Sequence, residues 1–310
     1  MGTPNAAGDW SSEMEVNAFR RLFPVHYYER HLSESIRPML DPWKKTRDTI
    51  VSLGAVASSD GSLLTMLAAI KIEVMTPVYS PGEGSIAVEF HMPPICSPVG
   101  RWRKDHSLFQ CDLHFMEMSA LHSFNLVADT LRVHLEGSGM IDLKELFLIK
   151  GEAAWMVYLD IYSLDADGAL FDAALLSAVA AFSHVRIPGV SLNDEGRMVM
   201  VSEELEGEKL DKEPVDKERR KLLLKSIPFS LICILHKNHI LADPTFEESI
   251  LETFMTVVLN SSGQLVSLYK PGGPVLAHTS AIQECVALTG QRMKELKEII
   301  DEAISTMEID

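Results

Sequence analysis

Acidic side chains stand two residues apart at Asp165 and Asp167, directly before Gly168. Carboxylates with this spacing can bind a divalent cation through their oxygens. The EF-hand pattern, however, needs another oxygen ligand at its fifth position, and this segment has none. Short acidic turns are commonly structural, and an acid near a helix start interacts favourably with the helix dipole. We therefore interpret Leu164–Gly168 as a strand-to-helix turn.

A second group of acids follows in the stretch 240–252, at Asp243, Glu247, Glu248 and Glu252. Carboxylates grouped in this way could bind a metal ion or protonate a leaving oxygen. A charged, solvated face beside a strand also produces such a group. We favour the solvated face for these acids.

Other motifs that could carry chemistry are incomplete. The set His106, Cys111, His114 and His122 matches no standard zinc spacing. The run 137–139, Gly-Ser-Gly, lacks the third glycine of a dinucleotide loop, and no nucleophile-elbow motif is present. We predict no catalytic residue, no metal ion and no cofactor.

Basic and aromatic residues alternate at Arg101, Trp102, Arg103 and Lys104. Such a cluster can contact single-stranded RNA through charge and base stacking. A second basic cluster, at 217–221, is diluted by acids. For both clusters we favour an ordinary solvated surface over RNA binding. Residues 101–104 are our candidate RNA-binding residues.

Two elements must position the first acidic turn. Apolar side chains alternate with others from Trp155 to Tyr162, with the period of two of a packed strand. The segment Ala169–Phe182 is apolar nearly all round, with Asp172 as its only charge. A helix without a polar face has to be buried, so we predict a central core helix.

The rest of the chain divides at a charged segment. Before it we predict a helix from Ser12 that ends or kinks at Pro24, because the capping-box spacing starts it and proline interrupts it. After it we predict a long final helix from Ser280. The predicted strands cover 49–56, 64–74, 85–91, 197–202, 227–236, 253–260 and 264–270.

Bulk composition bounds the possible functions. The chain has 310 residues, enough for one large domain or two closely packed ones. Its net charge of −16 predicts weak RNA binding by the chain alone, because such binding depends on neutralising phosphates. Four distant cysteines indicate reduced thiols, and the absence of a long apolar run predicts no membrane contact.

Two runs carry a family resemblance: LDIYSLDADGALFDAALLSAVAAF and IPFSLICILHKNHILADPTFEESI. They resemble the RNase PH-like family, and within it the non-catalytic ring subunits of the eukaryotic RNA exosome. The resemblance implies an α+β, RNase PH-like fold (ribosomal protein S5 domain 2-like), with two pseudo-symmetric strand-rich halves and central and C-terminal helices. We expect an N-terminal helical segment at 1–36, a first half at 37–203 with an atypical block at 99–136, a charged linker at 204–226 and a second half at 227–310.

The resemblance also identifies where catalytic residues would stand. Active members carry a Thr-Arg pair just after Asp-Gly that holds phosphate, and here those positions are Leu170 and Phe171. Active members also set two aspartates six residues apart, and here those positions are Glu248 and Phe254. A phosphorolytic enzyme needs a fixed cation for its attacking anion. The resemblance therefore implies a chain without catalytic activity.

The implied function is a structural subunit of the exosome core ring. Such a subunit supports 3′–5′ RNA processing and degradation, including ribosomal RNA maturation and messenger RNA turnover and surveillance. Its implied partners are other RNase PH-like subunits in a hetero-hexameric ring, RNA-binding cap subunits and a hydrolytic exoribonuclease subunit, in the nucleus, nucleolus and cytoplasm. Two alternatives stay open: an active phosphate-dependent 3′–5′ exoribonuclease, and an unrelated small-molecule enzyme of similar α+β architecture that uses Asp165, Asp167 or Asp243.

Overall fold

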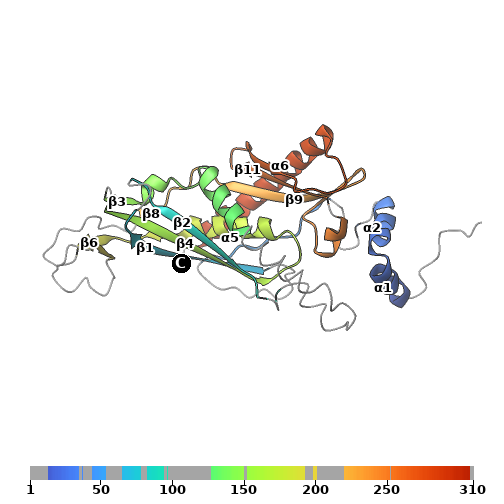
Figure 1. The fold of residues 1–310 in the computed structure, drawn as a ribbon, viewed down its shortest axis with the longest axis horizontal. Coiled ribbons are helices and arrows are strands. Elements are labelled where there is room, and N and C mark those ends of the chain that lie inside the picture. The colour runs from blue at the N-terminus through green and yellow to red at the C-terminus, as the bar shows by residue number, and fades with distance from the viewer. Residues whose placement is uncertain are drawn as a thin grey trace, which may run out of the picture.

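The computed structural model describes residues 13–34, 37, 44–53, 65–77, 82–93, 96, 127–149, 152–192, 198–200, 220–251 and 253–307. Two helices, α1 (Glu13–Leu22) and α2 (Pro24–Ser33), lie at one end of the molecule (Figure 1). Pro24 stands in the first turn of α2, where its missing N–H costs nothing. The predicted break at Pro24 is confirmed.

The first half contains a four-stranded sheet built on one long strand. That strand, β4 (Ala153–Asp165), pairs antiparallel with β1 (Thr65–Met75) and β3 (Phe147–Ile149) and parallel with β2 (Ser85–His91). The predictions for 64–74, 85–91 and the strand before the acidic turn are confirmed.

The strand predicted at 49–56 is wrong over its described part, because residues 44–53 contain no strand. Side chains of the second half hold this segment, where a strand would be held by backbone hydrogen bonds to its neighbour. Asp243 accepts the main-chain N–H of Arg47, and Arg292 donates to the carbonyl of Arg47 and to the hydroxyl of Thr49.

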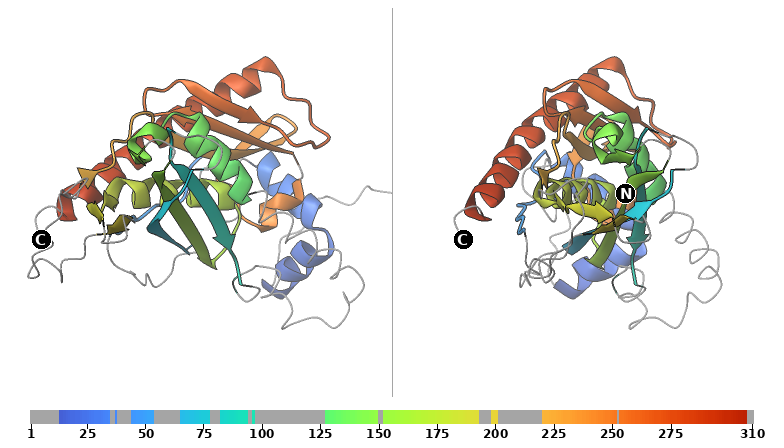
Figure 2. Two further views of the ribbon diagram at one scale, coloured as in Figure 1. Left: turned by 60° about the vertical axis from the view of Figure 1, so that its left-hand side comes forward. Right: turned by 90° about the vertical axis from the view of Figure 1, so that its left-hand side faces the viewer.

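Helix α5 (Leu170–His184) lies between the two halves (Figures 1 and 2). It packs against β1 and β4 on one side and against β9 of the second half on the other. Ala174, Leu175, Val179 and Phe182 are at most 1% exposed. The prediction of a central core helix is confirmed.

The atypical block 99–136 is described from residue 127, where a helical segment, 127–137, begins. Leu131 and Leu135 of this segment are fully buried in the main core. The 3₁₀ helix η2 (Leu143–Leu146) follows. The described part of the block is therefore packed into the first half.

Short paired strands connect the two halves. β5 (Arg186–Ile187) pairs with β8 (Arg220–Lys221), and β6 (Val190–Leu192) pairs with β7 (Met198–Met200). β7 lies within the strand predicted at 197–202. The charged segment 204–226 is described from residue 220. There Arg220, Lys221, Leu223 and Lys225 are exposed, while Leu222 is buried and β8 pairs with β5.

The second half is an antiparallel sheet covered by a helix. Its strand order is β10 (His239–Ala242), β9 (Pro228–His236), β11 (Phe254–Asn260) and β12 (Leu265–Tyr269). The 3₁₀ helix η4 (Glu247–Leu251) precedes β11, and α6 (Thr279–Met307) packs on β9 and β11. The predicted strands, their hairpin and the final helix are confirmed. No helix in the described ranges is both long and apolar enough to cross a bilayer.

Candidate functional site

The acidic turn before α5 is a junction between the halves. Gly168 has φ +74°, and a Cβ on it would lie 2.2 Å from the carbonyl oxygen of Pro244. Only glycine allows both this backbone conformation and this close approach. Asp167 Oδ1 accepts the main-chain N–H of Phe246 at 3.0 Å. These contacts support our structural interpretation of the turn.

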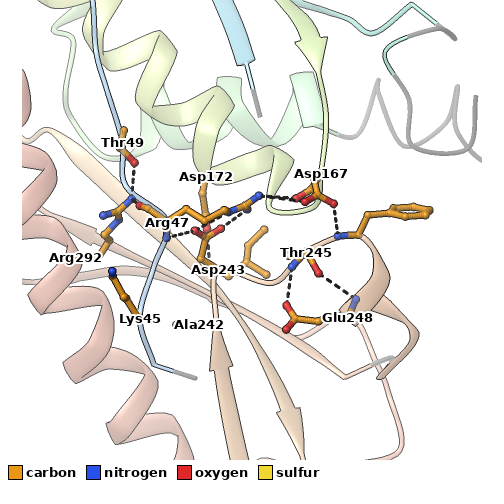
Figure 3. A network of polar contacts seen from close by, with 12 residues as sticks. Lys45, Arg47, Thr49, Asp167, Asp172, Ala242, Asp243, Thr245, Glu248 and Arg292 are labelled. Carbon is orange, nitrogen blue, oxygen red and sulfur yellow. Dashed lines mark hydrogen bonds and ion pairs between the residues drawn. The ribbon is translucent and has the colours of Figure 1, made fainter. Parts of the chain in front are cut away.

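Arg47 binds the same junction from a third segment (Figure 3). Its Nε donates to Asp243 Oδ2 at 3.0 Å, its Nη2 contacts Asp243 Oδ1, and its Nη1 donates to the carbonyl of Asp167 at 2.7 Å. Burial opposes ionisation of Asp243, but the hydrogen bonds and charge of Arg47 outweigh it and lower the pKa of Asp243. Asp243 is therefore held as a carboxylate paired with a guanidinium.

Glu248 stands at the first of the two positions where the resemblance places a catalytic aspartate, and it is fully buried. Arg37, also 0% exposed at its side chain, donates from Nε to Oε1 and from Nη2 to Oε2, both at 2.7 Å. The main-chain N–H of Thr245 adds a bond to Oε2 at 2.9 Å. The predicted solvated face is wrong for Glu248. The neutralising charge comes from a residue 211 positions away, which the local sequence does not reveal.

Glu247 is held by the N-terminal helices. Its Oε2 accepts from the guanidinium of Arg20 and, at 3.0 Å, from the hydroxyl of Tyr28. The prediction of solvated acids is therefore wrong for Asp243 and Glu248, which are buried, whereas the side chain of Glu247 is 26% exposed. Glu252 lies outside the described residues. Each acid receives one arginine from the N-terminal part of the chain. We call these three pairs the arginine clamp: Arg20–Glu247, Arg37–Glu248 and Arg47–Asp243.

The two positions that hold phosphate in active members lie at the start of α5. Phe171 packs its ring against that of His134, with the ring centroids 5.4 Å apart. Both Leu170 and Phe171 offer hydrocarbon where an anion would need donors. These side chains are suited to packing, and they cannot bind phosphate.

Asp172, one residue further on, is the only acid of α5. Its Oδ2 accepts the main-chain N–H of Ile232 at 2.6 Å, whereas its Oδ1 is buried without a hydrogen-bond partner. Burial raises the pKa of this carboxyl group to about 7. A partly ionised acid at this end of the helix opposes the approach of an anion.

Phe254, at the second position where the resemblance places a catalytic aspartate, packs against a separate apolar cluster. It packs with Tyr27, Tyr28 and Leu32 of α2, and with Leu251 and neighbouring strand residues of the second half. The aromatic ring that replaces the acid therefore helps to seat the N-terminal helices, beside the Arg20–Glu247 pair of the clamp.

The other candidate residues are placed as follows. Arg101, Trp102, Arg103 and Lys104, and the histidine and cysteine set at 106–122, lie outside the described residues. Of the second basic cluster, Arg220 and Lys221 are described, and both belong to β8. The roles of the three clamp arginines were not predicted. A signal was available, because the runs 25–38 (VHYYERHLSESIRP) and 46–49 (TRDT), which contain Arg37 and Arg47, resemble the N-terminal segment of the family's ring subunits.

Fold and site together define a class: α+β proteins with two RNase PH-like halves that enclose a central helix. The match to the 3′ exoribonuclease family falls in two parts, domain 1 over residues 45–188 and domain 2 over residues 226–292. This chain belongs to that family, the RNase PH family.

Relatives and solved structures agree with this assignment. The chain is 27% identical to the exosome complex component rrp43 of Schizosaccharomyces pombe, over 82% of this chain and 87% of the relative. It is 29% identical to the exosome complex component Rrp42 of Methanopyrus kandleri, over 74% of this chain and 77% of the relative. The Archaeoglobus fulgidus exosome with RNA bound to the active site has the same fold, with a TM-score of 0.66 at 21% identity over 92% of this chain and 99% of that chain. The predicted RNase PH-like fold is confirmed.

Proposed function

We propose that this chain is a non-catalytic structural subunit of the RNA exosome core ring. In that role it supports the 3′–5′ processing and degradation of RNA by the assembled complex, including ribosomal RNA maturation and messenger RNA turnover. The names of the relatives, exosome components of a yeast and of an archaeon, support this assignment.

The arginine clamp is the observation that carries the non-catalytic part of the proposal. Phosphorolysis needs free cations for the attacking phosphate, and acids that can bind a metal ion or transfer a proton. Here the buried guanidinium of Arg37 and the carboxylate of Glu248 neutralise each other at 2.7 Å. Arg47 is bound to Asp243 in the same way. The guanidinium groups and the carboxylates are thus paired with each other, and the pairs join segments of the chain.

The partners follow from the proposed ring. They are other RNase PH-like subunits in a hetero-hexameric ring, RNA-binding cap subunits and a hydrolytic exoribonuclease subunit. A chain with net charge −16 is expected to meet RNA mainly through the basic surface of its partners. Within this chain we propose that Arg101, Trp102, Arg103 and Lys104 contact RNA, and that the protein acts in the nucleus, nucleolus and cytoplasm. We further propose the domain limits 1–36, 37–203, 204–226 and 227–310.

A phosphorolysis assay tests the non-catalytic assignment. The purified full chain is incubated with a 3′-labelled single-stranded RNA, inorganic phosphate and Mg²⁺, and nucleoside diphosphate release is measured beside an active RNase PH as positive control. We expect no release above the no-protein background. Phosphate-dependent release that is lost in Glu248→Gln would instead establish the exoribonuclease alternative.

A further inference from the structure

The outer face of the first sheet, away from α5, brings two acids together. Glu89 on β2 and Asp160 on β4 are register partners in the parallel pair. Like charges directly opposite each other on neighbouring strands destabilise a sheet. Within the described residues, neither carboxylate forms an ion pair with a lysine or an arginine. A cation between the two strands would relieve their repulsion.

His91 supplies a nitrogen ligand at the same place. It follows Glu89 by two residues, so its side chain projects from the same face of β2. Its Nε2 lies 3.4 Å from Glu89 Oε2. Its ring stacks on that of Tyr162, with centroids 4.7 Å apart and an interplanar angle of 19°. The aromatic stack holds the imidazole beside the two acids.

One of these separations has the value found in a metal site, and all three ligand atoms lie within 4.8 Å of one another. Zinc binds imidazole nitrogen and carboxylate oxygen at about 2.0–2.2 Å, so neighbouring ligand atoms of a tetrahedral site lie about 3.4 Å apart. The His91–Glu89 separation already has this value, and one ligand atom from each of Glu89, His91 and Asp160 lies within 4.8 Å of the others. We propose that these three residues form a Zn²⁺ site, with water as the fourth ligand.

The site lies at the surface, with Glu89 exposed and His91 and Asp160 partly exposed. Ala69 is the register partner of Asp160 on β1 and has a small side chain. Lys71, the nearest basic residue along that strand on the same face, has its ammonium 2.5 Å from Glu73. A bound ion would join β2, a strand at the edge of the sheet, to β4 at its centre. The site is separate from the arginine clamp and does not depend on the proposed function.

Zinc titration of the purified full chain tests the proposal. Binding is measured by isothermal titration calorimetry and by the rise in melting temperature, and Co²⁺ is used as a probe because tetrahedral Co²⁺ has an intense visible spectrum. The variants His91→Ala, Glu89→Gln and Asp160→Asn remove one ligand each. His278→Ala is the matched control, because this histidine is exposed and belongs to no group of potential ligands in the described part of the chain.

We expect one Zn²⁺ per chain, with affinity at least about tenfold weaker in each ligand variant and unchanged in His278→Ala. In the metal-free state Glu89→Gln and Asp160→Asn should melt no lower than the wild type, because each removes a repulsion. This separates ligand loss from misfolding. Failure to bind Zn²⁺, or binding of equal strength in wild type and ligand variants, would overturn the proposal.

Discussion

The buried pair of Arg37 and Glu248 allows a quantitative prediction about what holds the N-terminal segment in place. The variant Arg37→Met leaves a carboxylate that is 0% exposed, with only the N–H of Thr245 as a partner of Oε2. Breaking a buried pair by removing one partner costs roughly 3–5 kcal/mol, since the remaining charge stays uncompensated. This is a large share of the roughly 5–15 kcal/mol by which a domain is stable.

A second variant separates the charge from the packing. In Arg37→Met/Glu248→Leu neither charge of this buried pair remains. The carbonyls of Ala242 and Asp243 and the N–H of Thr245 still lose their partners. The two carbonyls are unpaired in both variants, so their cost cancels in the comparison. The unpaired N–H of Thr245 costs the double variant about 1–3 kcal/mol, against roughly 3–5 kcal/mol for the uncompensated charge of the single variant, so the double variant should recover about 2 kcal/mol. Urea unfolding followed by far-ultraviolet circular dichroism gives both free energies. A single variant that costs under about 1 kcal/mol, or a double variant less stable than the single one, would refute the reasoning.

Three further predictions concern the junction between the two halves and the packing of the N-terminal helices. Burial raises the pKa of Asp172 from 3.8 to about 7, so between these pH values the folded state keeps a proton that the unfolded chain loses. The stability that this proton contributes is complete below pH 3.8 and is lost as the pH rises through about 7. In urea titrations the advantage of Asp172→Asn over wild type should therefore grow by roughly 2–3 kcal/mol between pH 5 and pH 8, and a constant difference would contradict this. Gly168→Ala should lower the free energy of unfolding by at least about 2 kcal/mol, because the added Cβ would lie 2.2 Å from the Pro244 carbonyl oxygen. Gly82→Ala is the control in the same titration, because no atom lies within 4 Å of a Cβ at that position. Phe254→Ala should expose α1 and α2 to limited proteolysis while the rest of the chain resists, and uniform digestion would show that this ring does not seat the helices.

The elements with a local signal could be predicted from the sequence. The alternation from Trp155 to Tyr162 predicted β4, because one face of that strand is buried and the other is not. The lack of a polar face in Ala169–Phe182 predicted α5 and its central position. Pro24 marked the boundary between α1 and α2. In each case the information lies within about ten residues of the element.

Elements that depend on distant partners could not be predicted. The segment around Thr49 has the composition of a strand, but the acceptors and donors that hold it, Asp243 and Arg292, come from the second half. Glu248 has acidic neighbours that suggest a solvated face, whereas its partner Arg37 is contributed by the N-terminal segment. At the candidate site, the family resemblance identified the positions 170, 171 and 254. Their packing roles became visible only in the structure.

Affinity purification of the tagged full chain from cell extract, followed by quantitative mass spectrometry, tests the central claim most directly. A structural ring subunit should recover the other RNase PH-like subunits and the cap subunits in near-equal amounts. The variant Arg37→Met should recover less of them if the clamp keeps the chain in its assembling form. Recovery of none of these subunits by a soluble, folded wild-type chain would contradict the account.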